Sequence, residues 1–129
     1  GNMRKKIITM AVTLLLLGLL SAVEQISVVR LTSDAMARTQ ELLFLLGQNE
    51  MERGLEHANE MDAWWDAEAP KAELIINHTA TDDVRFTLSR LVAALEMGDR
   101  DDAFVYAREL EGNIEHVLER QELSWQNLL

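Results

Sequence analysis

Apolar residues recur along most of the chain at intervals of three and four positions, which is the spacing of amphipathic α-helices. Segments that alternate strictly between apolar and polar residues are few, and the chain contains a single proline. Leu, Ala, Glu and Arg, all good helix formers, are frequent. The pattern predicts an all-α protein, and 129 residues suffice for one small domain.

The first apolar segment carries no charge at all. Residues 7–23 (IITMAVTLLLLGLLSAV) reach about 26 Å as a helix, slightly short of the ~30 Å hydrocarbon core of a bilayer. Apolar residues as far as Val29 could complete the span. A cleaved signal peptide is the alternative, but Leu20 is bulky where the cleavage site requires a small residue two positions before Ala22. We therefore expect an uncleaved transmembrane or signal-anchor helix.

Charge is distributed unevenly along the chain. Arg4, Lys5 and Lys6 precede the apolar segment, so the positive-inside rule predicts a cytoplasmic N-terminus and a body outside the cytoplasmic membrane. Subtracting these three from the 12 basic residues leaves 9 against 22 acidic ones, a net charge of −13. Such an acidic body repels phosphate backbones and anionic lipid headgroups, and we expect no nucleic-acid partner. Cysteine is absent, which excludes disulfides, thiolate ligands and a cysteine nucleophile.

These features divide the chain into three parts. We expect Gly1 and Asn2, which precede Met3, to be left over from cloning. Residues 3–29 are the predicted membrane anchor, and residues 30–129 are the predicted extracytoplasmic helical bundle.

Four helices are expected in the body. They cover residues 33–46, 49–66, 70–97 and about 100–122. The first begins at Ser33 or Asp34, or else continues directly from the anchor, and Gly47 is expected to end it. Gly98 and Asp99 form a stop-and-restart pair that separates the third helix from the fourth.

Capping residues and the proline define the other helix ends. Asn49 is expected to cap the second helix, because Glu52 follows it at the spacing of a capping box. Pro70 is expected to open the third helix, at the first-turn position that tolerates proline. That helix is either continuous or broken near residues 79–81, with Thr81 as the cap of the restart.

A weak internal repeat relates the two halves of the body at an offset of 49 residues. Apolar positions correspond pairwise: Leu42 with Leu91, Leu46 with Leu95, Leu55 with Phe104, Ala58 with Ala107, Met61 with Leu110, and Trp65 with Ile114. Each copy predicts an αα-hairpin, and two hairpins can bury their apolar faces against each other as a four-helix bundle. Coincidence is the alternative, because amphipathic helices align with one another easily.

Three histidines and one aspartate are the candidates for a metal or small-ligand site. His78 and Asp82 are four residues apart and share one face of a continuous helix, and His57 or His116 could add a third ligand. Di-iron bundles use the order Glu-x-x-His, and no acidic residue lies three positions before any of these histidines. We therefore expect no metal or cofactor. His78 is interpreted as a helix-corner residue that is hydrogen-bonded to a backbone carbonyl or a carboxylate.

The chain also lacks the motifs of common enzymes. It contains no G-x-S-x-G elbow, phosphate loop or dinucleotide fingerprint, and we expect it not to be an enzyme.

Of the adjacent Trp64 and Trp65, one is expected to fill the core and the other to lie at its rim. Trp64 and three residues of the apolar C-terminal segment LSWQNLL are the candidates for partner contacts. Those three residues are Trp125, Leu128 and Leu129.

Several segments resemble a family of bacterial proteins, mainly from Gram-positive lineages, that is classified as a domain of unknown function. They are MRKKIIT at the start, IINHTATDDVRFTLSRL (75–91), MGDRDDAFVYARELEGNIEHV (97–117) and LSWQNLL. Asn77 and His78 fit a pattern of the family, whereas Ile114 stands where its members tend to have the Leu of Leu-Glu-His. The resemblance implies a hydrophobic N-terminal segment, an all-helical body and a small multi-pass membrane protein as partner. It implies no reaction.

Taken together, the sequence predicts a non-enzymatic, membrane-anchored helical module that interacts with a membrane partner or with itself. An extracytoplasmic metal or small-ligand sensor that uses His78 and Asp82 is the alternative.

Overall fold

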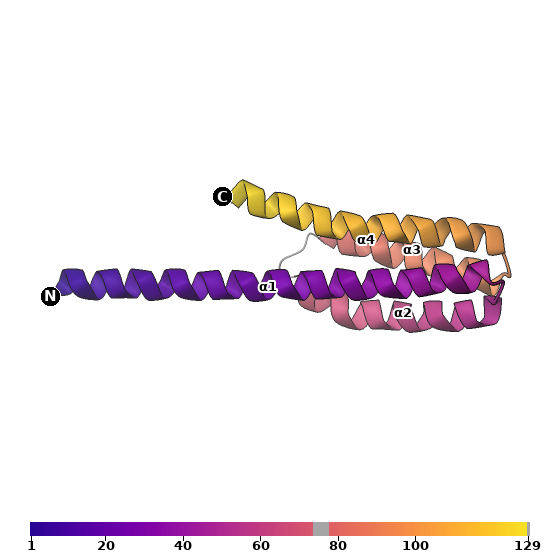
Figure 1. Cartoon of the computed structure of the whole chain (residues 1–129), viewed down its shortest axis with the longest axis horizontal. Coiled ribbons are helices and arrows are strands. Elements are labelled where there is room, and N and C mark those ends of the chain that lie inside the picture. Colours follow the sequence, from indigo (N-terminus) through magenta and orange to yellow (C-terminus); the bar gives the residue numbers. More distant parts are fainter. Residues whose placement is uncertain (74–77, 129) are drawn as a thin grey trace.

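The protein folds into four α-helices, and its described residues form no strand, which confirms the all-α prediction. The computed structural model describes the backbone of residues 1–73 and 78–128, and the side chains of these residues as far as Arg120. The helices are α1 (Asn2–Gly47), α2 (Met51–Ala72), α3 (His78–Glu96) and α4 (Arg100–Leu128). Figure 1 shows the second half of α1 packed with the other three helices, while its first half projects beyond the bundle.

The longest element, α1, is one continuous helix of 46 residues. A separate start at Ser33 or Asp34 is wrong, and the alternative of direct continuation from the N-terminal apolar segment is confirmed. No glycine or proline interrupts residues 19–46. The large apolar side chains of residues 3–26 are exposed, and Val28 is the first that is fully buried. Among the helices described, α1 alone is long and apolar enough to cross a membrane.

A tight turn joins α1 to α2. The Glu50 N–H donates to the Leu45 carbonyl (3.0 Å) and the Asn49 N–H donates to the Leu46 carbonyl (3.1 Å), which is the pattern of a Schellman motif. Asn49 takes the left-handed position of that motif, with φ 59°. The expected roles of two residues are therefore wrong. Gly47 is still helical, and Glu50, not Asn49, is the N-cap of α2.

The turn between α3 and α4 has the same geometry. The Asp99 N–H donates to the Ala94 carbonyl (2.9 Å) and the Gly98 N–H donates to the Leu95 carbonyl (3.1 Å). Gly98 has φ 70°, a conformation that glycine adopts without steric cost. An Asp99 carboxylate oxygen then accepts the N–H of Asp102 (3.1 Å) and caps α4. The predicted stop-and-restart at these residues is confirmed.

The junction of α2 and α3 departs from the prediction. α2 continues past residue 66 to Ala72 and includes Pro70 in its last turn, so the expectation that this proline opens a helix is wrong. Proline is tolerated there because it interrupts the hydrogen-bond ladder only at the end of the helix. α3 begins at His78, so neither one helix over 70–97 nor a restart capped by Thr81 is correct. Residues 74–77 lie outside the described part.

The helices form a ring in which α1 and α3 each contact both α2 and α4. One apolar stripe per helix faces the centre, as the sequence periodicity predicts. The largest fully buried apolar side chains are Trp65, Leu42, Leu46, Met61, Leu88, Leu91, Leu110 and Ile114. α4 runs to Leu128, beyond the expected end near residue 122.

The 49-residue repeat is structural. Both members of five predicted pairs are buried, and both members of the sixth, Leu55 and Phe104, are partly buried against the core. The hydrogen bonds of the two turns also correspond at the same offset, as do the left-handed residues Asn49 and Gly98. Amphipathicity alone does not require matching turn geometry, so coincidence does not account for the repeat. The fold is a four-helix bundle of two αα-hairpins.

Candidate functional site

The three histidines have separate surroundings. His57 on α2 is partly buried, and its Nε2 lies 2.9 Å from the backbone carbonyl of Arg38 on α1. His78 at the start of α3 is 74% exposed, with Nδ1 3.5 Å from a carboxylate oxygen of Glu73. His116 is also exposed, and its Nδ1 lies 3.5 Å from the carboxylate three residues further along α4. Each ring has a different partner, and the corner interpretation of His78 agrees with its contact to a carboxylate.

Asp82 is held by an arginine. Arg85 Nη1 donates to Asp82 Oδ1 (2.7 Å), and Arg85 Nε donates to Asp66 Oδ1 (3.2 Å) on α2. A third nitrogen of this guanidinium lies 3.6 Å from Glu73 Oε1. The network connects the end of α2 to the first turns of α3. Its geometry is that of a structural ion-pair cluster.

No metal site forms around these candidates in the part of the chain that the structure describes. There, no group of three or more His, Asp or Glu side chains is placed to hold an ion. The repeat explains His57 in another way, because position 57 corresponds to Tyr106, a ring that packs against the core and is partly buried like His57. His57 is therefore best understood as a packing residue between α1 and α2.

The adjacent tryptophans behave as predicted. Trp65 is fully buried, and its Nε1 donates to the Thr81 carbonyl (3.2 Å). Trp64 lies at the rim of the core, where the guanidinium carbon of Arg38 is 4.5 Å from its ring centroid. This is the distance of a cation–π contact.

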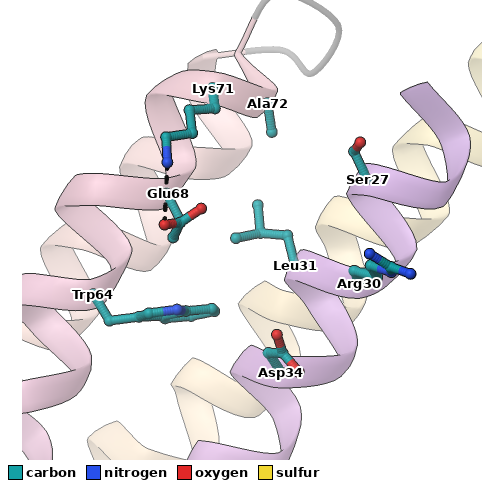
Figure 2. Close-up of a pocket in the computed structure, with 8 residues that line it drawn as sticks. All are labelled: Ser27, Arg30, Leu31, Asp34, Trp64, Glu68, Lys71 and Ala72. Carbon is teal, nitrogen blue, oxygen red and sulfur yellow. Dashed lines mark hydrogen bonds and ion pairs between the residues drawn. The ribbon is translucent and has the colours of Figure 1, made fainter. Parts of the chain in front are cut away.

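Trp64 also faces a cavity of about 440 Å³ between α1 and α2. It lies at the end of the bundle from which the apolar half of α1 projects. Its lining residues are Ser27, Arg30, Leu31, Asp34, Trp64, Glu68, Lys71 and Ala72. Figure 2 shows the Trp64 ring and the Leu31 side chain reaching from opposite helices into the gap, with Lys71 paired to Glu68 beside them.

Helical spacing brings these side chains together. The lining positions on each helix are three or four residues apart, so they share one face. The α1 face then meets the α2 face because the two helices form a hairpin. The sequence analysis identified Trp64 and missed the charged residues. The sequence signal that could have revealed them is a face of mixed charge on each helix, which on α1 lies just beyond the predicted anchor.

Two aspartates have perturbed acidities, and neither lies in this cavity. Burial raises the pKa of Asp62, the nearby Asp66 carboxylate raises it further, and Arg85 acts in the opposite direction. Asp102 shares a hydrogen bond with Asp99, and this contact and the charge of Asp99 raise the pKa of Asp102. Both shifts follow from local packing and capping.

The other partner-contact candidates lie at the C-terminus. α4 carries Trp125 and Leu128 beyond the part whose side chains are described, and Leu129 lies outside the described residues altogether. Their proposed contacts stay predictions.

The fold and the cavity define a class of protein: a small four-helix bundle that continues from a long apolar helix. A family model described as a domain of unknown function, DUF4363, matches residues 23–128. The chain belongs to this family. The matched region begins where the uncharged segment ends, so it contains the whole bundle. Searches of curated proteins and of solved structures gave no match.

Proposed function

We propose that the protein is a non-enzymatic accessory module of a bacterial cytoplasmic membrane. Its bundle lies on the outer side and binds a multi-pass membrane protein or a second copy of the chain. One observation carries the proposal: α1 is a single helix whose apolar half is exposed and whose other half belongs to the bundle core.

The chemistry of the apolar half supports a membrane span. Its large apolar side chains have nothing to cover them, an arrangement that water penalises and lipid favours. Two of its hydroxyls donate within the helix: Thr9 Oγ1 to the Lys5 carbonyl and Thr13 Oγ1 to the Thr9 carbonyl, both at 2.8 Å. Because the core of a bilayer contains no water, polar groups there must form their hydrogen bonds within the protein. The cations at residues 4–6 support a cytoplasmic N-terminus.

The unbroken helix makes a stiff connection between span and bundle. A helix of 46 residues is about 69 Å long, and its hydrogen bonds continue through the junction. The bundle is then held at a fixed height and rotation relative to the bilayer. This geometry suits a protein that presents a surface to a neighbour in the same membrane.

One face of α1 is suited to contact with another helix. Gly18 and Ala22 lie four residues apart, and a Cβ atom built at Gly18 would meet nothing within 4 Å. Small residues at this spacing let transmembrane helices approach closely. The same face leads into an apolar cavity of about 240 Å³ between α1 and α4, whose lining includes Val29, Met36 and Leu118.

The described residues that line the cavity between α1 and α2 suit a binding site better than a catalytic one. The one hydroxyl in its described lining belongs to Ser27 and donates to the Val23 carbonyl (2.9 Å), not to a carboxylate. A nucleophile needs a base that accepts its proton, whereas this hydroxyl is bonded to its own helix backbone.

Gentle solubilisation of membranes that contain the full chain tests the proposal. We expect affinity purification to recover a stoichiometric membrane partner or a homo-oligomer. Gly18→Ile should weaken this association because the added side chain separates the helices. Leu16→Ile, on the opposite face of α1, is the matched control and should leave it intact. Recovery of the wild-type chain as a lone monomer would contradict the proposal.

A further inference from the structure

We propose that the cavity between α1 and α2 binds the headgroup of a zwitterionic phospholipid, with its phosphate at Arg30 and Lys71 and its ammonium group at Asp34, Glu68 and Trp64. The inference deepens the proposed function and rests on it, because it requires α1 to span a bilayer. It adds a binding site that holds the bundle against the membrane surface.

The cavity lies at the height of the lipid headgroups. The uncharged segment spans about 26 Å, so a ~30 Å hydrocarbon core ends near Ile26. The headgroup layer adds about 5–7 Å on each side, or about four residues of helix. Ser27 and Arg30 therefore lie within this layer, and Asp34 lies just above it. The lining on α2 is level with them because it closes the same cavity.

The charges of the cavity match a zwitterion. Arg30 and Lys71 provide two cations and Asp34 and Glu68 provide two carboxylates, so the lining is neutral overall. Arg30 has no ion pair among the described residues, although the chain is strongly acidic. Figure 2 shows this side chain pointing away from the gap between α1 and α2, so it must turn toward Lys71 to reach a shared phosphate. Arg30 is exposed and free to turn, and a lipid phosphate would supply the partner that its guanidinium lacks.

Lys71 is available for the same ligand. Among the described residues, its only ion pair is with Glu68 at 3.3 Å, and the two side chains are 73% and 40% exposed. Exposed pairs of this kind contribute roughly 0–1 kcal/mol, so exchange for a phosphate costs little. The Glu68 carboxylate, once released from Lys71, can then accept a hydrogen bond from the ammonium group of the headgroup. An anionic lipid would leave Asp34 and Glu68 without a counter-charge.

The two apolar walls suit the rest of the headgroup. Trp64 offers an indole ring, which attracts ammonium groups through its π face and tolerates the wet, interfacial region of a bilayer. Arg38 packs against this ring and restricts its orientation. Leu31 reaches toward it from α1, as Figure 2 shows, and can contact the glycerol stem.

The second hairpin repeats only two of the five proposed ligand positions: Asp34 corresponds to Asp83, and Lys71 corresponds to another basic residue, Arg120. At the 49-residue offset, Thr79 replaces Arg30 and Asn113 replaces Trp64. Asn113 Nδ2 donates to Thr87 Oγ1 (2.6 Å) and to the Asp83 carbonyl (3.3 Å), so it connects α3 and α4 directly. The tryptophan and the complete set of charges are therefore found in the first hairpin, and the shared fold does not require them.

Native mass spectrometry of the full chain can test the site. The protein is released from micelles that contain phosphatidylethanolamine, phosphatidylcholine and phosphatidylglycerol in equal amounts. We expect one zwitterionic lipid to be retained in preference to phosphatidylglycerol. Arg30→Gln combined with Trp64→Leu should lower retention about tenfold, the loss expected for one charge-assisted hydrogen bond. Arg90→Gln, an exposed arginine on α3, is the matched control and should retain lipid like the wild type.

Three results would overturn the inference: equal retention by the double variant, preference for phosphatidylglycerol, or equally tight binding of soluble glycerophosphoethanolamine. If the double variant melts below the wild type, Lys71→Gln replaces it, because this exposed side chain leaves the core untouched.

Alkaline carbonate extraction of membranes that contain the full chain separates the headgroup site from the membrane anchor. A wild-type chain that is extracted contradicts the membrane anchor, whereas one that resists extraction yet shows no lipid preference contradicts the headgroup site alone.

Discussion

The two hairpins of the bundle share their core and their turns, yet they differ where their helices meet on the outside. In the first hairpin, Arg38 stacks on Trp64 at 4.5 Å. The equivalent residues of the second hairpin, Thr87 and Asn113, form a hydrogen bond of 2.6 Å. The first hairpin thus has a large stacked pair beside a charged cavity at the positions where the second hairpin has a compact polar contact. The repeated positions determine the fold, and the positions that are not repeated are free to acquire a function.

The largest effect is expected at a repeated core pair. Met61 and Leu110 correspond at the 49-residue offset, and both are fully buried. Met61→Asp and Leu110→Asp should each unfold the bundle, because an unpaired buried carboxylate costs several kcal/mol. Thermal melts followed by circular dichroism would check this. Val105→Asp, at a position that is 62% exposed, is the control and should melt like the wild type. Unfolding by only one of the two variants would contradict the equivalence of the hairpins.

Periodicity predicted the helices and most of the core because burial repeats every three or four residues. It identified the buried face that includes Leu42, Met61 and Leu110, and it placed one tryptophan inside the core. It could not place the first turn correctly. An oxygen side chain such as that of Asn49 suits both a helix N-cap and a left-handed C-terminal position, and only the hydrogen bonds of the turn distinguish the two.

The candidate site was harder to predict for a different reason. The His78–Asp82 spacing is a local pattern, but Arg85 satisfies Asp82 from within the same helix. The cavity, in contrast, joins charged residues from two helices, and a mixed-charge surface such as Arg30 and Glu68 looks like ordinary solvated helix in the sequence. Pairing of helices is tertiary information, so periodicity alone does not identify which faces meet.

The left-handed turn residues provide the next test. Gly98→Ala should destabilise the bundle by about 1–2 kcal/mol, because an alanine Cβ opposes the left-handed backbone. No atom lies within 4 Å of that Cβ, so the effect isolates backbone strain. Asn49→Gly should instead stabilise it by a few tenths of a kcal/mol. Urea unfolding curves of the full chain in detergent measure both changes. Shifts of the same sign would mean that the two turns are not equivalent.

Double-mutant cycles would compare the two outer contacts directly. Thr87→Val with Asn113→Ala should give a coupling of about 1 kcal/mol, the usual contribution of a neutral hydrogen bond. Arg38→Gln with Trp64→Leu should give about 0.5–1 kcal/mol, as expected for a cation–π pair that is partly open to solvent. Added salt should weaken the second coupling more than the first, because only the second involves a full charge. Equal salt dependence would show that charge does not distinguish the hairpins.

The smallest effect is expected at Asp62, whose equivalent in the second hairpin is Glu111. Burial and the neighbouring Asp66 raise the pKa of Asp62, so the folded protein favours its protonated form. At neutral pH the ionised carboxylate therefore opposes folding, and Asp62→Asn should stabilise the bundle. The gain should be about 0.5 kcal/mol or less, because the side chain is only partly buried and solvent screens it.

The pH dependence identifies the cause. The advantage of Asp62→Asn should shrink as pH falls through the raised pKa of Asp62 and vanish below the ordinary value of 3.8, where both states of the wild type are protonated. Glu111→Gln is the matched control, because Glu111 accepts hydrogen bonds from Arg108 (3.2 Å) and from Gln40, and neutralising it should not stabilise the bundle at any pH. Melting temperatures across an acid titration measure both variants. An advantage of Asp62→Asn that persists in acid would come from packing of the amide, and the electrostatic difference between the hairpins would then be absent at this position.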